Sequence, residues 1–382
     1  MRIAFVWNTG SPREWDDRDL ERGVGGSQAM MILYARQLAK MGHEVVCYTP
    51  YPAFGEPRVF HGVRWESALT GKWRHPGFDV VVSLRNPYNL MECQAPVRTF
   101  LANDQDCPML PLAVASKDCN LIITISEHQT KRYQMLYPDI SPEIYLTSSA
   151  GVEIEAYEQE APKMPQMCIY CSTPERGLAH LESLWPRIVE KVPLARLVVT
   201  GGFDLYGWPK QEVEKHQGEL MRRIASLPNV IMQLNSPRHI LQAWQKQASV
   251  MLYPSTYDEM CCISALECAA ARCAILTTDR AALSERVIEG ETGYLIPGEP
   301  GEYHYDRQFV LLAEKLLTDR QLCARMGVRG HVLAAEYAYW RLSQTWVERF
   351  IQVKEKDASS PRAKHAAQSP IAGYIRHQQG AG

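Results

Sequence analysis

The stretch STYDEMCCISALECAAARCAIL, residues 255–276, places Glu259 and Glu267 eight positions apart beside a run of alanine and cysteine. Apolar runs normally exclude carboxylates, because burying an unpaired charge is costly. The residues leading into it, SVMLYPS (249–255), are typical of a buried strand, and ISALECAAA (263–271) is typical of a helix packed on a sheet. TYDE is then the turn at the carboxyl end of the strand, the edge where parallel α/β sheets bind ligands. The stretch therefore predicts a parallel α/β sheet with two glutamates at its ligand-binding edge.

The two glutamates have a functional and a structural interpretation. In the functional one, each carboxylate accepts hydrogen bonds from vicinal hydroxyls, one set on a hexose and the other on a ribose, and both charges are solvated until the ligand binds. In the structural one, Glu259 favours the positive end of the helix dipole and Glu267 is a surface residue. The small apolar neighbours of Glu267 leave it little polar face, which favours the functional interpretation.

Strand-like and helical patterns alternate along most of the chain, as in parallel sheets with helical crossovers. The predicted strands lie at 2–7, 43–49, 78–84, 97–103, 120–126 and 143–149 in the first half, and at 166–172, 195–202, 229–234, 249–255, 273–278 and 293–298 in the second. The predicted helices lie at 27–42 with Ser27 as N-cap, then at 177–193, 239–248, 263–271, 281–290, 305–319, 320–337 and 340–356.

A polar, proline-marked segment at 151–165 separates the two series. We therefore predict an α/β protein of two Rossmann-like, doubly wound parallel-sheet domains that face each other across a cleft. The expected divisions are an N-terminal domain at 1–160, a C-terminal domain at 161–335, a helix at 336–356 that crosses back to the first domain, and a flexible tail at 357–382.

The amino-acid composition argues against several classes of partner and site. The net charge of −2 gives no global basic field for nucleic acid or an anionic membrane. No run of eighteen apolar residues is present and the first residues do not resemble a signal peptide, so we expect a cytoplasmic protein. The 11 cysteines are odd in number and follow no disulfide framework, which indicates reduced, buried thiols. CIYC (168–171) lacks the second pair that a zinc site needs.

Three other segments are candidates for contact with a ligand. STPERGL (172–178) places Arg176 where a helix is expected to begin, which suits a diphosphate, although Ser172 or Thr173 capping that helix is an equally good interpretation. Gly201 and Gly202 end a strand and allow a close approach of ligand to backbone. The loop GVGGSQ (23–28), with Gly25 and Gly26, lacks the spacing of a dinucleotide fingerprint and fits a loop that closes over a ligand.

Together, the E-x7-E spacing after YPS, STPERGL, VVTGG, GYLIP and the early GGSQ resemble family 4 of the retaining nucleotide-sugar glycosyltransferases. The resemblance extends from Gly25 to about Trp340 and is strongest between Pro254 and Ala271. It implies the GT-B fold, two Rossmann-like domains across a cleft. It also implies a nucleotide diphosphate sugar as donor, with no other cofactor, and a small-molecule, glycan or lipid-linked acceptor, so peripheral contact with a membrane is compatible with it.

The resemblance also assigns residues. It implies that Glu259 contacts the transferred sugar, that Glu267 holds the ribose hydroxyls and that Arg176 binds the diphosphate. Asn103 and Asp104 match a His-Asp pair near the transferred sugar. The implied donor-binding residues are Gly25, Gly26, Arg176, Gly201, Gly202, Cys262, Ile263 and Glu267, and the implied catalytic residues are Glu259, Asn103, Asp104 and Arg176. Acceptor contacts are expected from residues 7–26 and 83–94.

The chain departs from the family pattern at several of these positions. Asn103 replaces the commoner histidine and removes a titratable group. Cys262 and Arg272 stand where many relatives have glycine, and the second basic residue usually found shortly before Arg176 is not evident. We expect no metal site, because Arg176 and helix N-termini can stabilise the departing diphosphate. In the family that phosphate takes the acceptor's proton, so no separate protein base is required.

Three other functions remain alternatives. A nucleotide-sugar epimerase or a phosphorylase can use the same fold. A catalytically inactive sugar-nucleotide-binding subunit is compatible with Asn103. An NAD-dependent dehydrogenase requires dinucleotide binding, which the loop at 23–28 does not favour.

Overall fold

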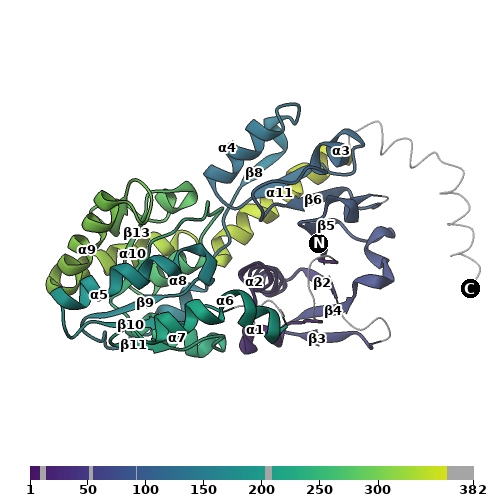
Figure 1. The fold of residues 1–382 in the computed structure, drawn as a ribbon. Coiled ribbons are helices and arrows are strands. Elements are labelled where there is room, and N and C mark those ends of the chain that lie inside the picture. Colours follow the sequence, from purple (N-terminus) through teal and green to yellow (C-terminus); the bar gives the residue numbers. More distant parts are fainter. Residues whose placement is uncertain (9–13, 51–54, 92, 203–208, 359–382) are drawn as a thin grey trace, which may run out of the picture.

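The structure, a computed structural model, describes residues 1–8, 14–50, 55–91, 93–202 and 209–358, and shows two lobes, each built on its own sheet (Figure 1). The predicted tail lies almost wholly outside the described residues. Among the described helices, none has the length and apolar composition of a membrane span.

The first sheet has the strand order β3-β4-β2-β1-β5-β6-β7-β8 and is parallel except at β3–β4. Its central strands carry apolar residues at consecutive positions and are buried on both faces, as expected of a sheet covered by helices on two sides. Its elements are β1 (Arg2–Val6), α1 (Asp19–Arg22), α2 (Gly26–Lys40), β2 (Glu44–Thr49), β3 (Arg58–Phe60), β4 (Val63–Ser67), β5 (Val80–Leu84), β6 (Val97–Leu101), α3 (Leu110–Ala115), β7 (Leu121–Thr124), α4 (Glu127–Leu136) and β8 (Tyr145–Thr147).

The second sheet has the order β11-β10-β9-β12-β13-β14 and its described pairings are parallel. Its order reverses between β9 and β12, so the loops after these two strands diverge and leave a crevice at the carboxyl edge. The elements are β9 (Met167–Tyr170), α5 (Leu181–Lys191), β10 (Arg196–Val199), α6 (Lys210–Ala225), β11 (Val230–Met232), α7 (Arg238–Gln247), β12 (Val250–Tyr253), α8 (Ile263–Ala270), β13 (Ala274–Thr278), β14 (Gly293–Ile296), α9 (Tyr303–Thr318) and α10 (Arg320–Ala335).

The chain passes between the two lobes twice, and the two passages lie side by side. Val152 on the first passage pairs with Ala338 on the second, with Val152 N–H donating to Tyr337 O at 2.9 Å. Helix α11 (Tyr339–Ala358) then packs on α2 and β6 of the first lobe (Figure 1). The structure therefore closes the chain back onto its N-terminal half.

The α/β fold prediction is confirmed, but several local predictions were wrong or incomplete. Residues 281–290 do not form an α-helix: a 3₁₀ turn spans Ala281–Glu285, because Ala281 has a φ of 50° and Ala282 N–H donates to Glu259 O. The N-cap of α2 is Gly25 rather than Ser27, and Gln28 Oε1 accepts from its N–H at 3.0 Å. The hairpin β3–β4 and the helices α1, α3, α4 and α6 were not predicted.

Candidate functional site

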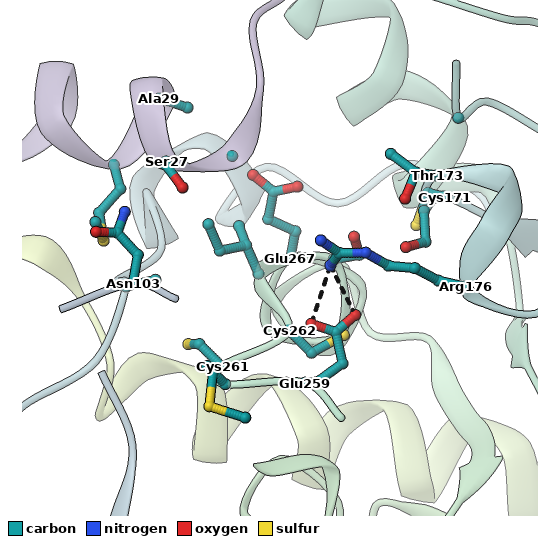
Figure 2. Close-up of a pocket in the computed structure, with 18 of the residues that line it drawn as sticks. Ser27, Ala29, Asn103, Cys171, Thr173, Arg176, Glu259, Cys261, Cys262 and Glu267 are labelled. Atoms are coloured by element: carbon teal, nitrogen blue, oxygen red, sulfur yellow. Dashed lines mark hydrogen bonds and ion pairs between the residues drawn. The ribbon is translucent and has the colours of Figure 1, made fainter. Parts of the chain in front are cut away.

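A cavity of ≈ 270 Å³ lies between the carboxyl edges of the two sheets. It brings together nearly all the residues predicted from the sequence. Those that line it are Gly26, Asn103, Asp104, Arg176, Gly201, Gly202, Glu259, Cys262, Ile263 and Glu267. Gly25 is not in the lining; it is the N-cap of α2, directly before Gly26. Figure 2 shows Ser27 and Asn103 on one side of the cavity and Arg176 and Thr173 on the other.

Glu259 lies at the cavity in a fully formed ion pair. It is 4% exposed, and Arg176 Nη1 lies 3.0 and 3.1 Å from its two carboxylate oxygens (Figure 2). Tyr253 donates its hydroxyl to Glu259 Oε1 at 2.5 Å. Burial, followed by the nearby Glu259 charge, raises the pKa of Tyr253 well above its ordinary value, so the phenol stays protonated and remains a donor.

Glu267 is held in a second network on α8. It is 6% exposed, Arg238 Nη1 lies 3.1 Å from its Oε1, and Gln245 Nε2 donates to its Oε2 at 3.2 Å. The expectation that both carboxylates are solvated without ligand was therefore wrong. The reason is tertiary: arginines distant in sequence neutralise each charge, which makes its burial tolerable.

Arg176 reaches the cavity from a different local structure than expected. Residues Pro174–Arg176 form a 3₁₀ turn, and helix α5 begins only at Leu181. The turn is close-packed, because a Cβ on Gly177 would lie 2.1 Å from Pro254 O. The guanidinium also lies over the Tyr257 ring, 4.3 Å from its centroid. Arg176 is thus fixed by packing, and the predicted helix N-terminus is absent at this position.

The N-terminus of α8 also lies at the cavity. Its N-cap, Cys262, has φ 60° and ψ 75°, a left-handed conformation that favours glycine. Arg272, just after the same helix, has a φ of 62°. We noted from the sequence that many relatives have glycine at both positions. The left-handed backbone explains why glycine is favoured there. Ile263 and Ser264 begin the helix and line the cavity, so their backbone N–H groups favour an anion there.

Asn103 and Asp104 follow β6 and enter the cavity from the first lobe. Both amide atoms of Asn103 are buried and have no hydrogen-bond partner among the described residues. Asp104 Oδ1 lies 3.2 Å from Arg85 Nη2. Burial raises the pKa of Asp104, partly opposed by Arg85. An orphaned amide carrying a donor and an acceptor suits a ligand hydroxyl, which can both donate and accept.

Among the charged and aromatic residues of the lining, sequence reasoning missed Arg238 and Tyr257, and it included Arg85 only within the expected acceptor segment 83–94. Arg85 comes directly after β5, and Tyr257 lies in the loop after β12, so their positions could have been found from the strand pattern. Arg238 is the first residue of α7, after β11, and carries the same signal. A Cβ on Gly201 would lie 1.6 Å from Ser172 O. The close approach at this glycine is therefore between the ends of two neighbouring strands, whereas from the sequence we expected an approach of ligand to backbone.

Two Asp-x-Asp tripeptides, residues 17–19 and 104–106, have a pattern that can hold a divalent cation against a diphosphate. Asp17 is instead bound by Arg36 at 2.6 Å and by His61 at 2.8 Å. Within the described part of the chain, no group of three or more His, Cys, Asp or Glu side chains is placed to hold a metal ion. Metal independence therefore stays a prediction.

Comparison with protein families gives one match, the model described as glycosyl transferases group 1, over residues 160–331. Residues 160–331 are a group 1 glycosyltransferase domain. This domain contains β9 to β14 and most of the cavity lining, including Arg176, Glu259 and Glu267. Comparison with curated protein sequences finds no significant match.

Solved structures resemble this chain over most of its length. Sucrose-phosphate synthase from Thermosynechococcus elongatus matches with a TM-score of 0.72 and 14% identity, covering 92% of this chain and 98% of its own. HepE of Anabaena, in a complex with UDP and glucose, gives a TM-score of 0.68 at 15% identity, covering 92% and 100%. WaaG, a glycosyltransferase involved in lipopolysaccharide biosynthesis, gives 0.64 at 16%, covering 91% and 99%. The fold is therefore GT-B.

Proposed function

We propose that this protein is a retaining glycosyltransferase that moves a hexose-type sugar from a nucleotide diphosphate sugar to a hydroxyl acceptor without a metal ion. One observation carries the proposal: Glu259, Glu267, Arg176 and the start of α8 converge on a single cavity between two parallel sheets. Carboxylates suit sugar hydroxyls, whereas a guanidinium and a helix N-terminus suit a diphosphate.

Arg176 is proposed to bind the donor diphosphate while keeping contact with Glu259. Its Nη1 lies within hydrogen-bond distance of both carboxylate oxygens, and a guanidinium has five N–H donors in a planar fork. The side chain can therefore bridge Glu259 and a phosphate oxygen. Negative charge grows on the diphosphate as the bond to the sugar breaks, so a cation fixed by Tyr257 stabilises the transition state more than the ground state.

The first lobe is proposed to supply the sugar and acceptor contacts. Asn103, with its orphaned amide, faces the cavity opposite Arg176 (Figure 2). Asp104 lines the same cavity. The segments expected to contact the acceptor, 7–26 and 83–94, follow β1 and β5 at the same edge; of these, residues 9–13 and 92 lie outside the described residues. Gly26 is close to Ile263 of the other lobe, since a Cβ on it would lie 3.1 Å from Ile263 Cδ1.

The proposed reaction breaks the bond between the anomeric carbon and the diphosphate oxygen. A new bond to the acceptor oxygen forms on the face that the diphosphate leaves. The acceptor's proton passes to the departing phosphate oxygen, so atoms and charges balance without a protein base. Asn103, which does not titrate, is compatible with this path.

A thermal-shift screen with UDP, GDP, ADP and dTDP, followed by transfer assays with the matching labelled sugar nucleotides, tests the proposal. HepE binds UDP and glucose, so UDP-glucose is the first donor to try. We expect one nucleotide to raise the unfolding midpoint in a concentration-dependent way. Transfer should be retained in a chelator, and the product should keep the anomeric configuration of the donor.

The variant Glu259→Gln tests whether this carboxylate contributes to sugar transfer rather than to nucleotide binding. We expect transfer to fall by about two orders of magnitude while nucleotide binding persists, because the group contacts the sugar rather than the nucleotide. Glu291→Gln, at an exposed ion pair with Arg329, is the control and should behave as wild type. Binding of no nucleotide by the wild type would exclude the proposal. Sugar conversion without an acceptor would indicate an epimerase, and binding without turnover an inactive subunit.

A further inference from the structure

Arg238, the first residue of α7, lies between two carboxylates from distant parts of the chain. Its Nε and Nη2 lie 2.9 and 2.8 Å from Glu153 Oε2, and its Nη1 lies 3.1 Å from Glu267 Oε1. The arginine side chain is 10% exposed. Burial by itself lowers the pKa of Arg238, but Glu267 and Glu153 together raise it above its ordinary value. The guanidinium is therefore a permanent cation that joins Glu153 to Glu267.

Gln245 fixes the other oxygen of Glu267. Tyr157 donates its hydroxyl to Gln245 Oε1 at 2.6 Å, and burial raises the pKa of Tyr157 well above its ordinary value, so the phenol remains a donor. Gln245 Oε1 must then accept, which leaves its Nε2 to donate to Glu267 Oε2 at 3.2 Å. Each oxygen of Glu267 is thus held by one donor from the protein.

A carboxylate has about four lone-pair sites, two on each oxygen. With Arg238 on one oxygen and Gln245 on the other, each oxygen keeps acceptor capacity, and Glu267 lines the cavity. Two adjacent hydroxyl groups are the chemical complement of such a carboxylate. We propose that Arg238 is a positioning residue that, together with Glu153, holds Glu267 in the orientation that accepts both ribose hydroxyls of the donor nucleotide. This inference rests on the proposed function.

Glu153 lies in the segment that joins the two lobes, so it connects the support of Glu267 to that segment. It directly follows Val152, the residue that pairs with Ala338 where the two passages of the chain lie side by side. It is also the N-cap of the 3₁₀ turn Ile154–Tyr157, which supplies the Tyr157 hydroxyl. Both supports of Glu267 therefore start from the inter-lobe connection, so a shift of this connection would disturb the ribose contact.

The test compares affinity for UDP and for 2′-deoxy-UDP by titration calorimetry, with the GDP and ADP pairs measured in parallel. A site built to bind a hydroxyl discriminates strongly against an analogue that lacks it. We expect the wild type to prefer the ribonucleotide by about tenfold or more, the value of roughly one charge-assisted hydrogen bond. In Arg238→Met the preference should fall to about two- to threefold, with Arg238→Lys and Glu153→Gln between these limits.

Steady-state transfer gives a second readout. The variants should raise the donor KM with little change in kcat, since the ribose is remote from the bond that breaks. Arg329→Met removes an exposed arginine that pairs with Glu291 and is the control. Because Arg238→Met leaves the buried Glu267 and the partly exposed Glu153 without this cation, Arg238→Lys and Glu153→Gln are the decisive variants if that variant does not fold.

The outcomes separate the two proposals. A wild type that binds no ribonucleotide overturns both. A wild type that binds and transfers, together with folded variants of unchanged ribose preference, overturns the positioning role alone. An equal loss of affinity for both nucleotides also overturns it, because this result is expected if Arg238 contacts the diphosphate directly.

Discussion

Cys262 carries a left-handed backbone conformation at the start of α8, with its side chain buried beside the cavity. Left-handed backbone costs an ordinary residue about 1–2 kcal/mol, and glycine escapes this cost. Arg272 at the end of the same helix is in the same situation but gains an ion pair with Glu160 at 3.0 Å. The two positions show how a chain can carry strain at both ends of a helix that forms its site.

A pair of variants isolates the backbone strain at position 262. Cys262→Gly and Cys262→Ala both remove the thiol, so their difference reports the backbone. We expect the glycine variant to be more stable by about 1 kcal/mol, which is a difference of about 2 °C in unfolding midpoint for a domain of this size. Calorimetry measures it.

Position 264 is the matched control for that pair. Ser264 has ordinary helical surroundings in α8, so Ser264→Gly should be less stable than Ser264→Ala by about 1 kcal/mol. The opposite signs at the two positions are the expected result. A glycine penalty at both positions would show that the conformation of Cys262 is not strained.

At the scale of elements, the connection between the lobes depends on one glycine. Gly151 has a φ of 79°, and a Cβ there would lie 2.5 Å from the Tyr339 ring at the start of α11. Tyr339 in turn packs against Tyr34 of α2, at 4.9 Å between ring centroids. The close approach of linker and helix therefore requires the residue without a side chain, and it fixes where α11 begins.

Gly151→Ala should destabilise the protein by more than backbone strain alone. Gly42→Ala is the control, because Gly42 has a similar φ of 85° with open space around its Cβ position. We expect the first variant to cost about 1–3 kcal/mol more than the second, as overpacking does. Denaturant unfolding measures both.

A double-mutant cycle identifies the cause of that difference. In a Tyr339→Ala background the extra cost of Gly151→Ala should shrink, because the ring that meets the new methyl group is gone. Equal costs in both backgrounds would show that Tyr339 is not the obstacle.

At the scale of the whole molecule, the two lobes are held together by polar contacts near the cavity. Glu285 of the second lobe accepts from the backbone N–H groups of Glu127 and His128 at 3.0 and 2.6 Å, at the N-terminus of α4. Arg286 donates to Ile125 O at 3.1 Å and to Cys261 O at 2.8 Å. These contacts join the start of α4 to the segment that carries Glu259, so they hold the two lobes together next to the site.

Glu285→Ala should loosen this closure without unfolding either lobe. A carboxylate at a helix N-terminus contributes about 0.3–1 kcal/mol, so the amides of Glu127 and His128 should exchange with deuterium about two- to fivefold faster. Glu291→Ala, on an exposed ion pair within the second lobe, is the control. Unchanged exchange at these two amides would mean that Glu285 does not contribute to closure.

Strands were predicted more completely from the sequence than helices were. Most of the twelve predicted strands were found because buried parallel strands are continuous apolar runs; β8 and β11, at sheet edges, are only partly buried but keep short apolar runs. The hairpin β3–β4 was missed because β3 is short and largely exposed, and α6 because its sequence, KQEVEKHQGELMRRIA, is mostly polar. At 281–290 the helical pattern was overridden by contacts with residues 259 and 261.

The sequence by itself determined the α/β alternation, the GT-B fold and the residues that come after the strands, because local patterns of polarity and spacing encode these. Only the tertiary structure decided that Glu259 pairs with Arg176 and that Glu267 pairs with Arg238. The partners are 83 and 29 positions apart, and no local pattern encodes such distances. A buried charge needs a counter-charge, but which arginine supplies it depends on how the strands are ordered in the sheet and on which loops that order brings to the same edge.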